Sequence, residues 1–226
     1  MTADDDNEQS GRRPRPERSQ FSLRTARMEA FSDGVFAIAI TLLVLEIAVP
    51  AATEKHIGHA LLEQWPIYLA YFVSFASIGN AWLNHSLITE YLNRTDSILL
   101  RLNLLLLLFV SILPFPTKMI STYLHNVTAE RVSVVLYGCN LLAIAGLTGV
   151  IWHYAVSEQL VRRDADDDEL RALAGKIDPS LISYAVAIGV GLLFPRAGVA
   201  LFLAIAVYLL IPYRAIIRWF RRHRHA

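Results

Sequence analysis

The sequence predicts an all-α membrane protein that crosses the bilayer with six helices. Of its 226 residues, 54% are hydrophobic and only 18% are charged, whereas soluble domains have roughly 25% charged residues. Mean hydropathy is +0.40, and the apolar residues gather in long runs. A spanning helix needs about 20 mostly apolar residues. Six runs are predicted to span: Phe31–Val49, Leu61–Leu83, Ile98–Ile120, Val132–Val156, Leu181–Phe194 and Ala197–Ile217.

Each span has a supporting signal of its own. The first follows a polar helical start at Arg27, and the second ends in the polar stretch NAWLNH. The third contains NLLLLLFVSILPF, which has none of the charged stripes that a helix of a soluble bundle shows. The fourth is the long apolar run around Cys139. The fifth is short and ends at Phe194-Pro195-Arg196, so we expect the last two spans to form a tight hairpin.

Polar segments flank the spans at both ends. Residues 1–24 are first acidic, then basic and proline-containing, and they lack the apolar core of a secretory signal peptide. We expect a disordered cytoplasmic tail there, a six-helix transmembrane domain over residues 25–217, and a basic cytoplasmic tail over residues 218–226. The stretch RRDADDDELRALAGK is expected to be a solvated loop on the cytoplasmic side.

Composition and motifs disfavour several function classes. The net charge of +1 gives no reason to expect a nucleic-acid partner. The single cysteine, Cys139, cannot form an internal disulfide, and no metal site or cofactor is expected around it. The scattered histidines form no HExxH motif, and no GxSxG motif is present. We therefore do not expect an enzyme.

The basic residues are distributed unevenly between the two sides of the predicted spans. With the N-terminus inside, 17 of the 21 Lys and Arg residues fall in cytoplasmic segments. Such an excess is typical of the cytoplasmic side of membrane proteins. The sequence thus predicts a multi-pass protein of the cell (plasma) membrane with both termini in the cytoplasm. The basic residues left at the outer ends are Lys55, Lys118, Arg131 and Arg196.

The first span has a narrow apolar stripe. At about 100° per residue, Phe31, Leu42 and Leu45 lie within about 40° of Ile38, and Thr41 lies about 60° from it. Ser32 and Asp33 point to the other side of the helix, well over 100° away. The sequence therefore separates an apolar face from a polar one. By itself, such a stripe more often packs or faces lipid than lines a pore.

The polar side of the first span faces other polar residues at the same end of the molecule. A carboxylate near the membrane normally finds a partner inside the protein, and Arg27 and the neighbouring helices offer candidates for Asp33. The second span ends with Trp82 and His85, and the third begins near Asp96 and Asn103. For His85 we expect a structural hydrogen bond, with a gating or proton-sensing role as the alternative. Trp82 by itself is typical of an interfacial anchor.

The stretch RMEAFSDGVFAIAITLLVLEI resembles the signature first helix of the transmembrane protein 175 family, the endolysosomal potassium channels, in its bacterial single-repeat form. The family pattern Arg-x-x-x-Phe-Ser-Asp is matched by Arg27, Phe31, Ser32 and Asp33. The W-x-x-H of Trp82 and His85, the following Asp96 and the six-helix length also agree. The resemblance covers roughly residues 27–213.

This resemblance implies a specific function. Family members are cation channels without a re-entrant pore loop, and bacterial members are homotetramers whose first helices line the pore. Carried over by position, Ile38, Leu42 and Leu45 would form a hydrophobic constriction, and Thr41 would influence potassium preference. Arg27, Ser32 and Asp33 would hold the first helix against the next two. The resemblance implies permeating K⁺ and other monovalent cations, surrounding membrane lipid, no cofactor and modest potassium-over-sodium selectivity.

Two other functions stay open at this point. A secondary transporter would have polar or broken helices at the bilayer midplane, whereas the midplane predicted here is nearly free of charge. A proton channel would use His85 or Asp33. Glu46, near the outer mouth, either raises the local cation concentration or is an interfacial carboxylate.

The uneven distribution of basic residues makes the topology testable. In a Cys139-free background, a cysteine at Thr53 should react with an impermeant thiol reagent added outside intact cells. A cysteine at Ala165 should react only after the membrane is opened. Labelling of the Ala165 position from outside would contradict the six-span topology.

Overall fold

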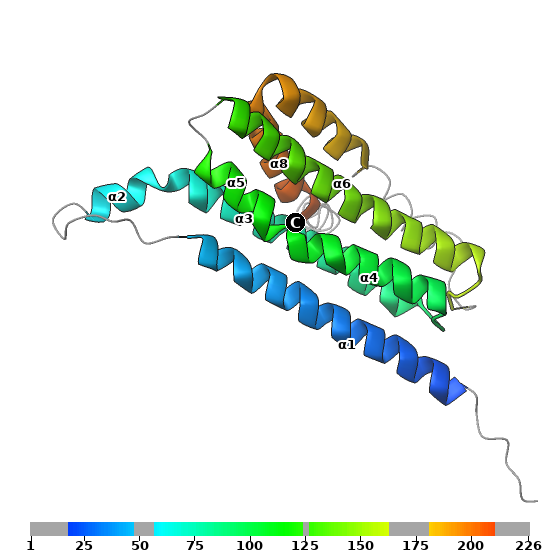
Figure 1. The fold of residues 1–226 in the computed structure, drawn as a ribbon. Coiled ribbons are helices and arrows are strands. Elements are labelled where there is room, and N and C mark those ends of the chain that lie inside the picture. The colour runs from blue at the N-terminus through cyan, green and yellow to red at the C-terminus, as the bar shows by residue number, and fades with distance from the viewer. Residues whose placement is uncertain (1–17, 48–56, 124–126, 163–180, 211–226) are drawn as a thin grey trace, which may run out of the picture.

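The computed structural model describes residues 18–47, 57–123, 127–162 and 181–210, and every regular element in these ranges is a helix (Figure 1). A 3₁₀ segment, η1, continues the first helix. The helices are α1 Arg18–Leu42, η1 Leu43–Glu46, α2 Ile57–Glu63, α3 Trp65–Tyr91, α4 Ser97–Ile112, α5 Pro114–Thr122, α6 Val127–Ser157, the helix Leu181–Leu193, and α8 Pro195–Leu210.

Helix α1 lies along one edge of the bundle and packs against α3 and α4, while α6 and α8 lie on the far side of these helices (Figure 1). One face of α1 is buried at intervals of three or four residues, which is the spacing of a helix that packs on one side only. The other face is open. The buried side chains are Thr25, Met28, Ser32, Phe36 and Ala39, followed by Leu43 at the start of η1.

The first span differs from its prediction at both ends. α1 begins at Arg18, so residues 18–24 are helical although a disordered tail was expected up to residue 24. The α-helix ends at Leu42 and continues as η1 to Glu46, short of the predicted Val49. Residues 1–17, the acidic loop and the basic C-terminal tail lie outside the described residues.

Prolines divide two of the predicted spans. The second becomes α2 and α3, which meet at Gln64 just before Pro66, and α3 runs on to Tyr91. The third becomes α4 and α5, because Pro114 has no N–H to continue the α-helical bonds. Instead, the Leu113 N–H donates to the Val110 carbonyl oxygen, which tightens the last turn of α4.

Three helical segments among the described residues are long and apolar enough to cross a membrane: Arg24–Glu46, Ser97–Thr122 and Thr128–Ser157. Two shorter apolar helices follow, Leu181–Leu193 and Pro195–Tyr208. The chain is therefore a multi-pass membrane protein. α3 has 27 residues but carries more polar side chains than these segments.

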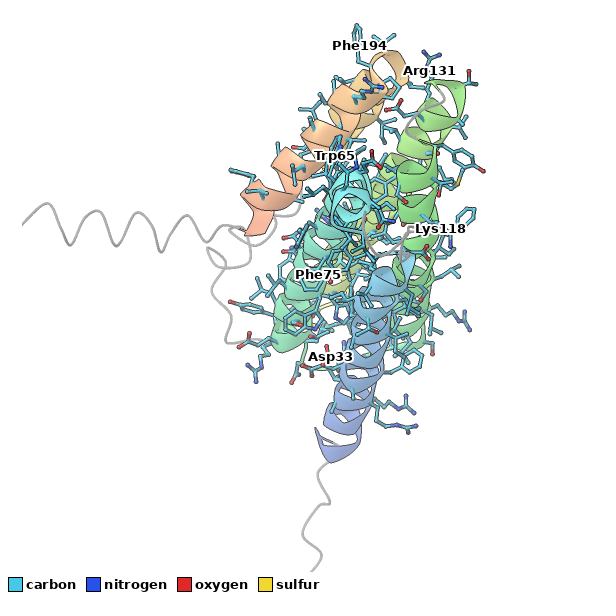
Figure 2. The ribbon with its side chains drawn as sticks, turned by 90° about the vertical axis from the view of Figure 1, so that its left-hand side faces the viewer. Asp33, Trp65, Phe75, Lys118, Arg131 and Phe194 are labelled. Carbon is cyan, nitrogen blue, oxygen red and sulfur yellow. The ribbon has the colours of Figure 1, made fainter. Side chains whose placement is uncertain are left out.

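The two shorter helices form the expected hairpin. Only Phe194 separates them, and their backbones touch where glycines meet: a Cβ on Gly198 would lie 2.7 Å from the Gly191 Cα atom. Arg131 and Phe194 lie at the same end of the bundle, with Asp33 toward the other end (Figure 2). At that other end, an isolated bridge between Leu92 and Val161 joins the α3–α4 connection to the segment after α6.

Candidate pore helix and its polar contacts

The open face of α1 carries the stripe that the sequence predicts. Phe31 is 56% exposed, Ile38 60%, Leu42 41% and Leu45 72%. Ile40, on the other side of the helix, is only partly exposed and packs against the core. The described part of one subunit therefore leaves an apolar stripe of α1 largely uncovered.

The change from α to 3₁₀ geometry keeps Leu45 in this stripe. A 3₁₀ helix turns about 120° per residue, against about 100° in an α-helix. Leu43, at the start of η1, is completely buried, and Leu45, two residues later, is exposed. The C-terminal end of α1 is thus anchored by Leu43, while the Leu45 side chain stays exposed.

Thr41 lies on the flank of the stripe with its side chain exposed. Its Oγ1 donates a hydrogen bond to the Ile38 carbonyl oxygen at 2.9 Å. Because the hydroxyl proton is directed to the helix backbone, the oxygen lone pairs stay available on the open face. An oxygen in this state is a suitable ligand for a cation.

Asn103 of α4 joins three helices through its side-chain amide. Its Nδ2 donates to Ser32 Oγ of α1 at 2.9 Å, and its Oδ1 lies 2.8 Å from His85 Nε2 of α3. Ser32 in turn donates to the Met28 carbonyl oxygen at 2.8 Å. All three side chains are buried. The predicted residues Ser32, His85 and Asn103 therefore form one hydrogen-bonded chain.

The direction of these bonds sets the tautomer of His85. Since Asn103 presents its oxygen to the ring, Nε2 must be the nitrogen that donates. His85 Nδ1 is buried and has no hydrogen-bond partner in the described part of the chain. The ring also packs on Phe36 of α1, with 5.5 Å between the ring centroids. His85 thus contacts both α4 and α1.

Asp33 makes a second link between α1 and α3. Its Oδ1 accepts a hydrogen bond from Trp82 Nε1 at 2.8 Å, and Figure 2 shows Asp33 on the part of α1 that lies beside α3. Arg27, which the sequence offered as a partner for Asp33, lies elsewhere. It lines a cavity of about 460 Å³ between α1 and α4, together with Arg24 and the exposed Phe31.

Asp96 does not contact the first span, with whose polar side the sequence analysis grouped it. Its Oδ1 caps α4 by accepting from the Leu99 N–H at 2.8 Å, and its Oδ2 accepts from the Tyr154 hydroxyl at 2.6 Å. Asp96 therefore ties α4 to α6 and does not reach α1.

The hydrogen bonds of Asp96 determine the direction in which its pKa is shifted. Burial acts to raise the pKa of its carboxyl, but the hydrogen bonds from Tyr154 and the backbone outweigh burial, so the pKa is lowered. The bonded carboxylate thus stabilises the fold above the usual carboxyl pKa, and this stabilisation is lost as the pH falls through the lowered value.

An ion pair holds η1, at the C-terminal end of α1. Glu46 Oε2 lies 3.0 Å from Lys118 Nζ of α5, so the Glu46 charge is compensated within the subunit. Sequence analysis did not connect these two residues, nor Asp96 with Tyr154. Both pairs join distant parts of the chain, and no local spacing signals such a contact.

Comparisons with known proteins agree with this geometry. The family model described as "Endosomal/lysosomal potassium channel TMEM175" matches residues 27–114. A potassium channel of Streptomyces collinus is 42% identical over 179 residues, which cover 78% of this chain and 86% of that protein. The endosomal/lysosomal proton channel TMEM175 of Gallus gallus is 40% identical over 127 residues, or 50% of this chain and 25% of that protein.

A solved structure shares the fold as well. The crystal structure of a lysosomal potassium-selective channel TMEM175 homolog from Chamaesiphon minutus has a TM-score of 0.73 and 38% sequence identity. The match covers 82% of this chain and 96% of that one. Identity at this level over nearly the whole length of a relative indicates common descent, and the chain therefore belongs to the TMEM175 potassium channel family.

Proposed function

We propose that this protein is a potassium-permeable cation channel in which four copies of the chain place α1 around a central pore. The observation that carries the proposal is the uncovered stripe of Phe31, Ile38, Leu42 and Leu45, beside Thr41, on a helix whose other face is buried. The potassium-channel names of the bacterial relatives support the same conclusion.

Rotational symmetry would complete the ion pathway, which one subunit cannot enclose by itself. A single helix cannot enclose a pathway, but rotational symmetry turns each residue of a stripe into a ring. Rings of Ile38, Leu42 and Leu45 would be stacked along the axis, with Ile38 nearest the cytoplasm. Alkyl rings offer water no hydrogen bonds, so a narrow constriction of this kind gates by dewetting.

Thr41 would supply the polar ring of the pore. Its lone pairs face outward because its proton is bonded to the Ile38 carbonyl oxygen. A ring of such oxygens between the Ile38 and Leu42 rings would replace part of the hydration of a passing ion. With only one polar ring, modest potassium-over-sodium selectivity follows.

The polar contacts would orient α1 and would not bind the permeating ion. Ser32 is bonded to Asn103, and Asp33 to Trp82. Both bonds join α1 to α4 or α3 on the side of the helix away from the stripe. Arg27 and Phe31 would lie at the inner end of α1, where they line the cavity between α1 and α4.

For topology we propose six crossings in the plasma membrane with both termini in the cytoplasm. Arg131, predicted to lie at an outer end, is toward one end of the bundle, and Asp33, predicted to lie at the inner end of the first span, is toward the other (Figure 2). This grouping supports the orientation. Residues 1–17 and 218–226 would be cytoplasmic tails.

Proton permeation is the second candidate. The vertebrate relative carries the name of a proton channel. The titratable Asp33 lies on α1, and the titratable His85 of α3 packs beside α1. The reversal potential of the current under separate potassium and proton gradients distinguishes the two functions, because it follows the gradient of the ion that permeates.

The first prediction tests the pore stripe. Ile38→Asn should keep water in the constriction through its amide and raise basal potassium flux in liposomes severalfold. Ile40→Asn is the matched control, because Ile40 packs against the core, and it should not raise flux. An Ile38→Asn channel that assembles but conducts like the parent, or a leak caused by Ile40→Asn, would show that α1 is rotated differently around the pore.

The second prediction concerns selectivity. Thr41→Ala removes the hydroxyl oxygen from the pore surface and leaves the helix intact, so the potassium-to-sodium permeability ratio should fall toward one. Bi-ionic reversal potentials measure this ratio. The Ser111→Ala variant removes another hydroxyl that is bonded to its own helix, and it should leave the ratio unchanged. Equal ratios for parent and Thr41→Ala would assign selectivity elsewhere.

The third prediction concerns the anchor of α1. Asn103→Leu removes the acceptor of the bond that His85 Nε2 donates, and this stranded donor should cost about 1–3 kcal/mol of stability. Ser32 loses the bond that it accepts but still donates to the Met28 carbonyl oxygen. Thermal unfolding in detergent, followed by size-exclusion chromatography, should show earlier loss of the assembled protein. Asn93→Leu, at an exposed asparagine outside the helices, should have little effect. Equal stability of the two variants would contradict the anchoring role.

A further inference from the structure

A small polar cavity lies inside the subunit, apart from the stripe of α1. It has a volume of about 20 Å³ and is enclosed by α3, α6 and the helix Leu181–Leu193. Five of its lining residues carry polar side chains, although the cavity lies within apolar helices. These residues are Ser77, Asn80, Asn84, Thr148 and Tyr184.

Two of these polar groups are buried without a protein partner. Asn80 is 9% exposed and Tyr184 is 4% exposed. Within the described part of the chain, neither side chain makes a hydrogen bond to another protein group. Native proteins pair nearly all such groups with protein or with water. The amide of Asn80 and the phenol of Tyr184 therefore indicate a missing partner in the cavity between them.

The hydroxyls around the cavity add acceptors. Ser77 Oγ donates to the Val73 carbonyl oxygen at 2.8 Å, and Thr148 Oγ1 donates to the Ile144 carbonyl oxygen at 2.8 Å. Their protons are thus directed to their own helices. The lone pairs of Thr148 Oγ1 are left for a donor in the cavity, whereas Ser77 Oγ also has a hydrogen bond with Tyr137. The site offers both donors and acceptors but no charged side chain among the lining residues.

We propose that this cavity is a binding site for a resident water molecule. One water needs roughly 10–15 Å³ and two to four polar partners, and the cavity meets both conditions. The water would accept or donate at Asn80 and Tyr184 and donate to Ser77 or Thr148. It would join α3 to the helix Leu181–Leu193 through Asn80 and Tyr184. This inference does not depend on the identity of the permeating ion.

Pulsed X-ray radiolysis of the full-length protein in detergent tests the site, since hydroxyl radicals formed from a bound water oxidise the side chains that touch it. Tyr184 should be modified severalfold faster than Tyr137. Tyr137 is a matched control because it is equally buried but bonded directly to Ser74. The exposed Tyr208 reports the dose from bulk water. Equal modification of Tyr184 and Tyr137 would overturn the proposal.

A pair of variants separates resident water from local opening of the hairpin. Ala145 lines the cavity, whereas Ala143 is a half-buried alanine of the same helix that does not. Ala145→Val should fill the space and abolish the excess modification of Tyr184, and Ala143→Val should leave it. Loss of the excess in both variants, or in neither, would show that radicals reach Tyr184 from bulk solvent.

Discussion

The hydrogen bond from Asn103 to Ser32 decides which face of α1 stays open. A buried serine hydroxyl or a buried amide without a partner costs stability, so both strongly prefer the arrangement that pairs them. Once Ser32 faces α4, the regular turn of the helix sends Ile38 outward and Phe36 inward. The same amide bonds His85, and His85 packs on Phe36. The polar and the apolar contacts of α1 thus favour the same rotation of the helix about its axis.

Contacts at both ends hold α1, and its middle depends on apolar packing. Asn103 and Trp82 bond α1 at Ser32 and Asp33, and Lys118 pairs with Glu46 at its C-terminal end. The contact with Lys118 depends on the helix break at Pro114, because that break creates α5, the short helix that carries Lys118. In the four-subunit channel proposed above, the pore surface would therefore be positioned by bonds that lie away from it.

The interior of the subunit contains neutral polar side chains among its apolar ones. Ser74, Thr117 and Tyr137 form a buried hydroxyl cluster, and the cavity beside Asn80 and Tyr184 lies between α3, α6 and the helix Leu181–Leu193. A transporter would need a polar site of this kind large enough for a solute. With a volume of about 20 Å³, this cavity has room for water and not for a larger solute. The polar interior is therefore compatible with a channel and does not favour the transporter alternative.

The sequence by itself determined the all-helical membrane class and the angular position of the stripe, because hydropathy and the 100° helical turn are local properties of the chain. The motif of the first helix indicated the family. The sequence also indicated that Ser32, Asp33, Trp82, His85 and Asn103 lie near one another. The tertiary structure decided the pairing: Asp33 with Trp82 and not Arg27, Asp96 with Tyr154, and Glu46 with Lys118. It also decided where Pro66 and Pro114 divide the helices. Side-chain pairings of this kind depend on which helices become neighbours. A contact between two segments that are distant in the sequence is not visible in the residue spacing of either segment.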